Sequence, residues 1–449
     1  MKFFIKNYGC QMNLYDSEIM TDILSTAGYI MCDNVDEADI LLFNTCSIRE
    51  KADEKLFSDL GRAKSIKFKK QDLGKECLII VCGCVAQAKA STIFERVPYV
   101  DAVLGPQEIG NIAIVVNSLL EQRKNNEYPH ILMRDLNTRN KFATLKSTQI
   151  TKRGFSEFLT IQEGCNNFCT YCVVPYTRGR EFSRDAKDII NEAKRMISLG
   201  VKEITLLGQN VNSYNGEGTD GKTWSLDRLL YAMAEIDGLV RLKYITSNPK
   251  DITENIAKAH RDIDILVPFL HLPIQSGSDF ILKKMNRKYS TDKYLYSIDL
   301  LRQYRADMAF SSDFIVGFPE ESDKDFEDTL KIADKVRFAQ AYSFKYSPRE
   351  GTMAAKMNNQ VPEKIKSERL EILQNILNNH QNEFNRNTIG KTVSVLFTKY
   401  GKFKNQLVGR SEYSQAVSIC DSSIKIGDIA HVKITDIKSH SLVGIIEKK

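Results

Sequence analysis

Residues 158–182 read FLTIQEGCNNFCTYCVVPYTRGREF, and the interpretation of the whole chain starts from this motif. An apolar run typical of a buried strand leads into Cys165, Cys169 and Cys172. A structural zinc site needs four protein ligands, and no histidine lies nearby in the sequence. A redox pair of Cys169 and Cys172 would leave Cys165 without a role. An iron–sulfur cluster uses all three thiolates and leaves one iron open to a substrate or cofactor.

The composition of the chain excludes several classes of protein. With 449 residues, of which 42% are hydrophobic, the chain is long enough for about three globular domains. No apolar run has the length of a membrane span, and the N-terminus lacks the features of a signal peptide. We therefore expect a cytoplasmic protein with no membrane partner. In that compartment its ten cysteines would bind metal or do chemistry more often than form disulfides.

Strands alternate with helices on both sides of the cysteine motif, which predicts an α/β protein. After residue 154, six apolar runs are spaced by helical stretches such as 184–199, and a long amphipathic helix runs from Pro362 to near Gly390. The six runs are FLTIQ, EITLLG, RLKYIT, ILVPFLHL, FSSDFIVGF and AQAYSFKY. This pattern over residues 154–389 predicts a partial (β/α)6 barrel, whose site would lie at the carboxyl ends of the strands.

Residues 1–146 also alternate, with strand-like runs KFFIKN, ADILLFN, CLIIVCG and DAVLG and helices expected at 16–27, 51–69 and 107–122. This order predicts a doubly wound parallel sheet covered on both faces. Cys10, Cys46 and Cys84 follow the first three strands. Because ligands of such sheets lie beyond the carboxyl ends of strands, these cysteines could meet at one edge. Residues 123–153 are polar and aperiodic, so we expect a linker there.

Residues 390–449 change character to short strands with glycine-containing turns, which predicts a small antiparallel β-barrel. This segment has ten basic and five acidic residues, so it carries most of the net charge of +6. The expected RNA-binding cations are Lys391, Lys399, Lys402, Lys404 and Arg410. Phe397, Tyr400, Phe403 and Tyr413 lie among them, and aromatic rings between basic residues suit base stacking with phosphate contact. Alternatively, about half of these aromatics are barrel core, or the domain is only a solubilising accessory.

The Cys-x3-Cys-x2-Cys motif, with Tyr171 before its last cysteine, resembles that of the radical S-adenosylmethionine (radical SAM) enzymes. The resemblance implies a [4Fe–4S] cluster on Cys165, Cys169 and Cys172, with SAM bound to its open iron and cleaved to a 5′-deoxyadenosyl radical. It also implies a SAM pocket along the strand ends. Its expected residues are Tyr171, Gln209, Asn210, Ser247 and Gln275, although each polar side chain could equally serve ordinary loop hydrogen bonding.

Five further segments extend the resemblance over essentially the whole chain: YGCQMN, NTCSIREKADEKLFSDLGR, HLPIQSGSD, MNRKYS and CGCVAQ. Together they are similar to the methylthiotransferase family, which joins an N-terminal domain with a second three-cysteine [4Fe–4S] cluster, a radical SAM barrel and a C-terminal TRAM barrel. The resemblance places that auxiliary cluster on Cys10, Cys46 and Cys84. Cys82 competes with Cys84, and the pattern Gly-Cys-x-Ala-Gln favours Cys84.

The motifs are closest to the branch that methylthiolates C2 of N6-(dimethylallyl)adenosine at position 37 of tRNA, beside the anticodon. The implied chemistry is cluster-based: one SAM donates a methyl group to a sulfur on the auxiliary cluster, and a second SAM supplies the radical. No protein side chain is expected as a catalytic acid or base, and His271 is more simply structural. Implied partners are the anticodon stem-loop of tRNA and an electron donor such as flavodoxin or ferredoxin, acting on a monomer.

Three alternatives stay open at this point. The first is the same chemistry on N6-threonylcarbamoyladenosine in tRNA, and the second modifies an aspartate of a ribosomal protein. Residues 11–13 and 176–178 argue against both. The third, from a different class, is a non-catalytic RNA-binding iron–sulfur redox sensor, which would need neither SAM nor two open irons.

Two loops depart from the usual family pattern, which puts their local shape in doubt. Glu320 stands where glycine is common, and Glu350 and Met353 stand where proline is common. Residues 216–223, GEGTDGKT, also match the phosphate-binding loop of nucleotide hydrolases. That loop requires a strand entering its first glycine, and the preceding QNVNSYN is polar, so we expect a flexible glycine-rich loop near the barrel mouth instead.

Overall fold

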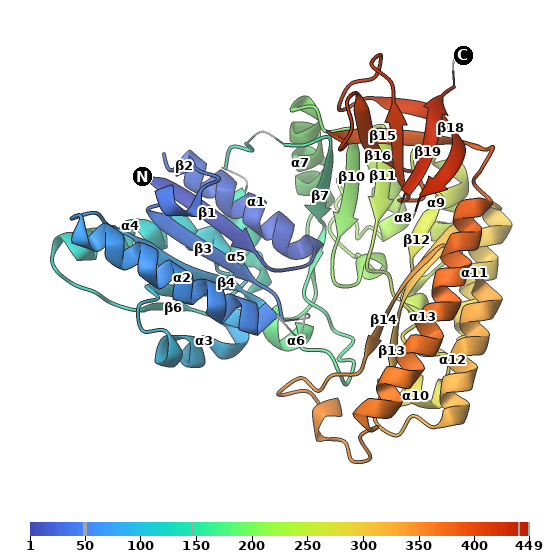
Figure 1. Cartoon of the computed structure of the whole chain (residues 1–449), viewed down its shortest axis with the longest axis horizontal. Coiled ribbons are helices and arrows are strands. Elements are labelled where there is room, and N and C mark those ends of the chain that lie inside the picture. Colours follow the sequence, from blue (N-terminus) through green and yellow to red (C-terminus); the bar gives the residue numbers. More distant parts are fainter. Residues whose placement is uncertain (48–51, 146–147, 152, 439–440, 448–449) are drawn as a thin grey trace.

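Three successive parts of the chain fold around separate sheets, as the computed structural model in Figure 1 shows. The structure describes the chain apart from residues 48–51, 146–147, 152, 439–440 and 448–449. The expected helix start at Lys51 and domain end at 146 therefore lie outside the described residues. None of the described helices is both long enough and apolar enough to cross a membrane.

The N-terminal part is a six-stranded parallel sheet in the order β2-β1-β3-β4-β5-β6. Its strands are β1 (Lys2–Asn7), β2 (Ile30–Met31), β3 (Ile40–Thr45), β4 (Leu78–Gly83), β5 (Ala102–Leu104) and β6 (Ile131–Met133). Residues of β3 and β4 are buried on both faces, which explains their continuous apolar runs.

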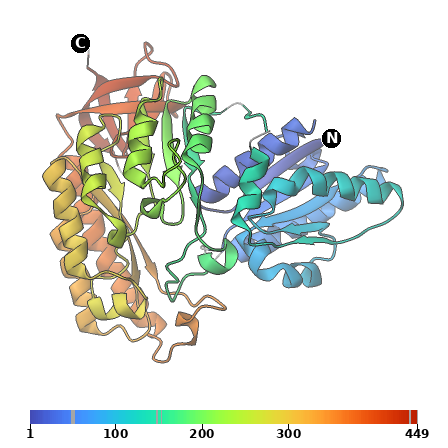
Figure 2. The same cartoon turned by 180° about the vertical axis from the view of Figure 1, so that it is seen from behind.

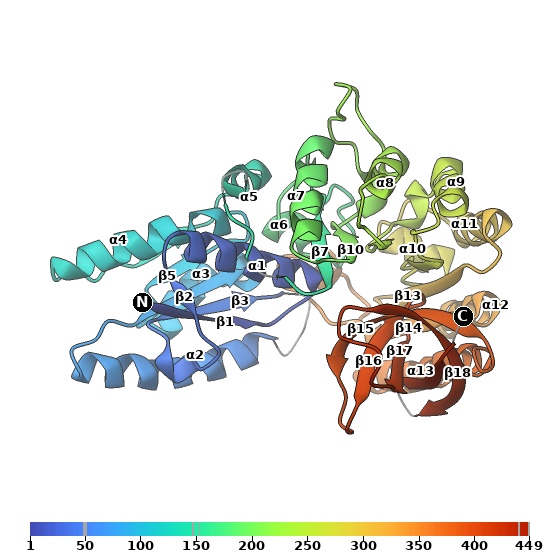
Figure 3. The ribbon, with the colours of Figure 1, turned by 90° about the horizontal axis from the view of Figure 1, so that it is seen from above.

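Helices cover both faces of this sheet, so the doubly wound arrangement is confirmed (Figure 3). One face packs on α1 (Gln11–Thr26) and α4 (Ile112–Lys124). The other packs on α2 (Ala52–Asp72) and α3 (Cys84–Arg96). Short 3-10 turns add η1 (Val35–Glu37) and η2 (Ile109–Asn111).

The central part has the six parallel strands that the sequence predicted, in two three-stranded sheets. The first is β7 (Ser156–Thr160), β10 (Glu203–Leu207) and β11 (Arg241–Tyr244), and the second is β12 (Phe269–His271), β13 (Ala309–Val316) and β14 (Gln340–Lys345). A parallel bridge between Leu242 and Leu266 joins them into one open barrel. The short hairpin of β8 (Gln162–Glu163) and β9 (Phe182–Ser183) flanks the cysteine motif.

Helices of the central part cover the outside of these sheets (Figure 2). Along the chain they are α6 (Val174–Thr177), α7 (Ala186–Ser198), α8 (Leu226–Ala234), α9 (Glu254–Asp262), α10 (Asp279–Lys284), α11 (Thr291–Tyr304), α12 (Asp323–Val336) and α13 (Glu363–Arg386), with η3 (Val211–Ser213), η4 (Pro249–Asp251) and η5 (Ala354–Lys356). The partial (β/α)6 barrel is therefore confirmed.

The C-terminal part is a closed five-stranded barrel in the order β15-β16-β17-β19-β18. Its strands are β15 (Thr392–Tyr400), β16 (Gln406–Ser411), β17 (Ala416–Cys420), β18 (Ile429–Lys438) and β19 (Ser441–Ile446). The pairing of β17 with β19 is parallel, so the barrel is not antiparallel throughout.

The small barrel closes the end of the large barrel where the strands begin (Figure 1). The buried Arg241, first residue of β11, donates to the carbonyl oxygen of Arg410 at 3.1 Å and that of Ser394 at 3.0 Å. The basic domain and the cysteine loop therefore lie at opposite ends of the large barrel.

The segment 123–153, expected as a linker, is partly folded. β6 extends the sheet at its edge, and α5 (Thr138–Leu145) packs against η2 with Phe142 in the core. The strand is only three residues long and half-exposed, and the helix has a largely polar sequence, so neither has the periodicity of a longer element.

The glycine-rich segment 216–223 is a tight hairpin that projects from the barrel (Figure 3), not a phosphate-binding loop. A bridge joins Glu217 to Thr223, and Asp220 accepts a hydrogen bond from Trp224 Nε1 at 2.8 Å. The element before it is the 3-10 turn η3 and not a strand, as the polar sequence predicted.

Glu320, which stands where the resemblance predicts glycine, has a left-handed backbone with a φ of 70°. Its carboxylate binds Lys284 Nζ at 2.9 Å. Because an L side chain costs about 1–2 kcal/mol in this conformation, we expect Glu320→Gly to be more stable than Glu320→Ala. Both variants lose the ion pair with Lys284, so the difference between their stabilities reports the cost of the backbone conformation. In thermal unfolding of the apo-proteins, the midpoint of Glu320→Gly should lie about 2–4 °C above that of Glu320→Ala. Equal midpoints would contradict this explanation.

Candidate cluster and cofactor site

Three adjacent parallel strands bring the N-terminal cysteines together, as expected from the sequence. Cys10 precedes α1 after β1, Cys46 directly follows β3, and Cys84 begins α3 after β4. A hydrogen bond with Cys46 lowers the pKa of Cys10 to about 6, against the effect of burial. Burial raises the pKa of Cys84, and the charges of Arg178 and Cys10 also act on it. Cys10 therefore lies close enough to interact with each of the other two cysteines.

The turn into Cys84 depends on glycine at the preceding position. Gly83 has a φ of 94°, and a Cβ there would lie 2.4 Å from the carbonyl oxygen of Thr45. Asn13 fixes the neighbouring strand end by donating to that same carbonyl at 2.7 Å. The Cys10 thiol in turn donates to Asn13 Oδ1 at 3.3 Å. Close packing of backbone and amide thus sets the spacing of this trio.

The structure places Cys84, and not Cys82, beside Cys10. Cys82 lies within β4 and is fully buried in the apolar cluster that contains Ile80 and Leu104. Burial raises its pKa well above the usual range of a thiol, so it stays neutral. All ten cysteines are without a disulfide bond.

The second trio lies on the loop between β8 and α6, next to the carboxyl end of β7. The backbone N–H of Cys165 donates to the carbonyl oxygen of Gly179 at 3.2 Å, which folds the loop back on the motif. The side-chain amide of Asn167 donates to Cys165 Sγ at 3.4 Å, and Arg287 donates to Cys169 Sγ at the same distance. Burial raises the pKa of Cys172 to about 12 and also raises that of Cys165.

Both trios fit a cluster better than a single metal ion. Among the described residues, no three cysteine, histidine or acidic side chains converge as the ligands of one ion would. A cubane spreads its ligands, because each thiolate binds a different iron. Each trio also has an arginine beside it: the charge of the buried Arg178 acts on Cys84, and the half-buried Arg287 donates to Cys169 Sγ. Thiolate donors with compensating positive charge fit the iron–sulfur clusters that the sequence predicted.

Unsatisfied polar atoms lie at the ends of the next two strands, where a SAM pocket was expected. Gln209 and Asn210 follow β10 and Ser247 follows β11. Gln209 Nε2, Asn210 Oδ1 and Ser247 Oγ are buried and have no hydrogen-bond partner among the described residues. A buried polar group without a partner costs about 1–3 kcal/mol, so three of them in one region indicate a polar ligand.

The other atoms of these side chains shape the loop. Gln209 Oε1 accepts from the N–H of Gly164, next to Cys165, and Asn210 Nδ2 donates to Asp251 at 2.8 Å. Tyr171 packs edge-on against Phe318, with ring centroids 6.4 Å apart. Gln275 has a φ of 74° at the start of the loop after β12 and pairs with β13 through its backbone. All of the expected SAM residues thus lie beyond the carboxyl ends of strands.

His271 lies on β12 inside the large barrel. Its Nδ1 is 2.8 Å from Ser311 Oγ and its Nε2 is 3.4 Å from Asp313 Oδ2. Both ring nitrogens have protein partners, which agrees with a structural role.

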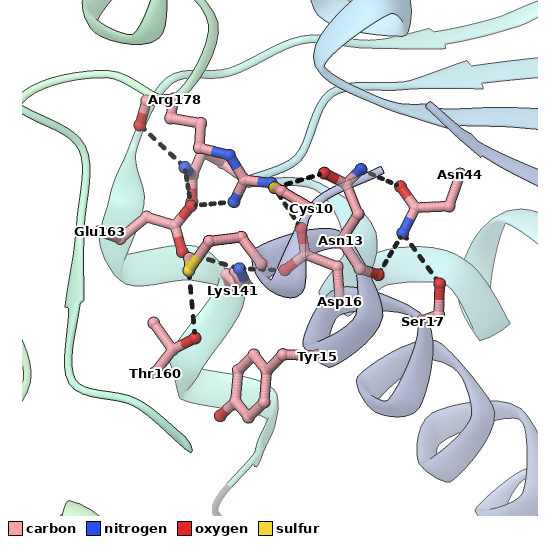
Figure 4. A network of polar contacts seen from close by, with 12 residues as sticks. Cys10, Asn13, Tyr15, Asp16, Ser17, Asn44, Lys141, Thr160, Glu163 and Arg178 are labelled. Carbon is pink, nitrogen blue, oxygen red and sulfur yellow. Dashed lines mark hydrogen bonds and ion pairs between the residues drawn. The ribbon is translucent and has the colours of Figure 1, made fainter. Parts of the chain in front are cut away.

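A buried network of four charged side chains lies near Cys10 (Figure 4). Arg178 donates to Asp16 at 2.8 Å and to Glu163 at 2.5 Å, and Lys141 binds the same two carboxylates. Burial opposes the charge of Arg178, but Cys84, Asp16 and Glu163 outweigh it and raise its pKa well above the usual range. Sequence analysis missed this network, because Asp16 and Arg178 are 162 positions apart.

The small barrel exposes to solvent all five basic residues that were predicted to bind RNA, which are Lys391, Lys399, Lys402, Lys404 and Arg410. Tyr400 and Phe403 are 74% and 65% exposed beside the lysine-rich turn.

Two of the four aromatics serve packing, as the alternative interpretation expected. Phe397 is fully buried in the barrel core. Tyr413 packs against Phe384, and its hydroxyl binds Asp307. Arg410 lies apart from the turn, next to the junction with the large barrel.

Comparisons with known proteins agree with this three-part arrangement. Residues 2–105 match the Uncharacterized protein family UPF0004, residues 159–333 the Radical SAM superfamily, and residues 386–446 the TRAM domain. The tRNA-2-methylthio-N(6)-dimethylallyladenosine synthase of Bartonella quintana is 50% identical over 448 residues, which cover 99% of this chain and 96% of that protein. The synthase of the same name from Agrobacterium fabrum is 48% identical, with 98% and 96% covered.

The chain belongs to the tRNA-2-methylthio-N(6)-dimethylallyladenosine synthases. Membership of this family confirms the resemblance found in the sequence and identifies the chain as a radical SAM methylthiotransferase. Among solved structures, the radical S-adenosylmethionine methyltransferase TsrM from Kitasatospora setae, with cobalamin and a [4Fe-4S] cluster, shares the fold. Its TM-score is 0.58 at 11% identity, with 79% of this chain and 77% of that chain covered.

Substitution of single cysteines tests which of them hold iron. We expect Cys84→Ala to lower the iron content of the reconstituted protein from about eight to about four per chain, because one of two [4Fe–4S] sites loses a ligand. The matched variant Cys82→Ala removes a buried thiol two residues away and should keep all the iron. Iron and sulfide analysis after anaerobic reconstitution measures both. Loss of iron in Cys82→Ala alone would reverse the assignment.

Proposed function

We propose that this chain methylthiolates C2 of N6-(dimethylallyl)adenosine in tRNA, giving the 2-methylthio derivative. The observation that carries the proposal is the pair of cysteine trios, each gathered at the carboxyl ends of parallel strands on either side of one buried contact. The names and near-full-length identity of the relatives support the substrate.

Two [4Fe–4S] clusters and SAM are the cofactors in this proposal. Cys165, Cys169 and Cys172 would hold one cluster, and Cys10, Cys46 and Cys84 the other. When bound, these groups supply a methyl group, a sulfur atom and a radical that removes the hydrogen from an aromatic carbon. The buried acidic and basic side chains near Cys10 are paired with one another, which suits chemistry that depends on positioning.

The protein's own residues bind and orient the cofactor in this scheme. Gln209, Asn210 and Ser247 offer one donor, one acceptor and one hydroxyl that have no partner in the described part of the chain, so they suit the polar groups of SAM. Gln209 also holds the N–H of Gly164 and thereby couples this pocket to the cysteine loop. Gln275 and Tyr171 would complete the pocket.

The TRAM barrel would bind the anticodon stem-loop of tRNA. Exposed lysines near Tyr400 and Phe403 combine phosphate contact with surfaces for base stacking. In the same proposal the enzyme acts as a monomer in the cytoplasm, and a reduced flavodoxin or ferredoxin supplies the electron.

Mass spectrometry of tRNA digests tests the reaction directly. With the anaerobically reconstituted protein, SAM, sulfide and a reductant, tRNA carrying N6-(dimethylallyl)adenosine should gain the 2-methylthio product. We expect no product from tRNA carrying N6-threonylcarbamoyladenosine. Cys169→Ala should abolish turnover, because one thiolate of the radical SAM trio is lost. Product on the threonylcarbamoyl substrate alone would contradict the proposed specificity, and SAM cleavage by Cys169→Ala would contradict the cluster assignment.

Salt dependence of tRNA binding tests the TRAM surface. We expect Lys399→Ala, Lys402→Ala and Lys404→Ala together to lower the slope of log affinity against log salt by about 2–3, because each lost phosphate contact contributes about 0.7–0.9. The control combines Lys187→Ala, Lys194→Ala and Lys364→Ala, which are exposed lysines of the large barrel. Filter binding at several salt concentrations measures both slopes. An unchanged slope in the TRAM variant would refute this surface.

A further inference from the structure

Arg178 is connected to both cysteine trios, through different atoms. Helix α6, which ends at the residue before it, packs against α3, which begins with Cys84. The charge of the Arg178 guanidinium acts on both Cys84 and Cys10, in the direction that lowers the pKa of each. The next residue, Gly179, accepts the hydrogen bond from the N–H of Cys165 through its carbonyl oxygen. One short segment therefore acts on the auxiliary trio through a side chain and on the radical SAM trio through the backbone.

Two carboxylates hold the Arg178 side chain in place, and a lysine holds both of them. Asp16 comes from α1 of the N-terminal part, Glu163 from β8, and Lys141 from α5 bridges the two carboxylates (Figure 4). The main-chain carbonyl of Arg178 also accepts from Gln107 Nε2 at 2.8 Å. All four charged side chains are at most 3% exposed, so their positions are fixed by the packing of two domains.

The stability of the fold alone does not explain such a network. A buried group of ion pairs rarely stabilises a fold more than apolar residues of the same volume would. Its two positive and two negative charges already balance, yet the charge of Arg178 also interacts with Cys84 and Cys10. A cluster ligated by thiolates is anionic, and its reduction potential depends on nearby charge and on hydrogen bonds to sulfur. The position of Arg178 therefore suits it to interact with the cluster as well as to join the domains.

We infer that Arg178 is a positioning residue of the auxiliary centre: its guanidinium holds Cys84 in place and compensates the negative charge of the cluster. The main chain of the next residue, Gly179, fixes the radical SAM loop at a set distance from that centre. This inference rests on the proposed function, since it requires a cluster on the N-terminal trio. It assigns Lys141, Asp16 and Glu163 as the frame that keeps the guanidinium aimed at the sulfurs.

The experiment isolates the auxiliary centre. In a parent protein with Cys165, Cys169 and Cys172 changed to alanine, only the N-terminal trio can bind iron, about four per chain. The test variant adds Asp16→Asn and Arg178→Met, which removes one charge of each sign. The matched control adds Glu192→Gln and Arg184→Met, because Arg184 and Glu192 form an equally buried pair that also contacts Tyr15 of α1 but no cysteine.

Two readouts follow the cluster without tRNA or turnover. We expect the test variant to lose iron to a chelator at least tenfold faster than the parent and to have a more negative midpoint potential in a titration followed by electron paramagnetic resonance. The control should match the parent in both. Arg178→Lys, which keeps the positive charge, should retain the parent's potential. If the first test variant does not fold, Glu163→Gln with Arg178→Gln removes the other partner and is measured instead.

The outcomes separate this inference from the proposed function. A parent that binds no cluster would overturn both. A parent that binds its cluster, with test and control variants alike in chelator loss and potential, would overturn only the role of Arg178. Equal shifts of the midpoint potential in Arg178→Lys and in the test variant would also overturn it, because the positive charge at position 178 would then have no part in the effect.

Discussion

The contact between α1 and the hairpin of β8 and β9 is the constraint on which this molecule depends. It buries Asp16, Lys141, Glu163 and Arg178 between two domains that each have their own sheet. Removing one member would leave a buried charge without its partner, at a cost of about 3–5 kcal/mol. The two domains are therefore held in one relative position, and the two cysteine trios with them.

Parallel-sheet geometry explains why such a contact can join two metal centres. Each trio lies beyond strand ends, the first after β1, β3 and β4 and the second after β7 and β8. Helix starts and loops at these ends expose N–H groups and leave room for side chains to converge. Two α/β sheets that meet near such ends can share one polar region, although neither contains all of its residues.

Long apolar runs made much of the fold predictable. The first five strands of the large barrel and the inner strands of the N-terminal sheet contain buried residues, so their sequences are largely apolar. The last strand, β14, was also predicted from its apolar run, although its Tyr342 and Phe344 are about half-exposed. The edge strands β2 and β6 are too short to produce such a pattern, and β16 is interrupted by Gly409 and Arg410. Helix α5 is largely polar because its buried Lys141 serves an ion network instead of an apolar core. The cysteines were found through spacing and resemblance, whereas Arg178 and Lys141 acquire their roles only from distant partners.

The small barrel covers the amino ends of the strands, while the cysteines lie beyond their carboxyl ends. A strand of five to eight residues spans about 17–27 Å. An RNA held by the lysine-rich turn must therefore reach along the full height of the large barrel before a base can enter it. The height of the large barrel would thus set the distance between the part of the RNA that the turn binds and the base that reacts.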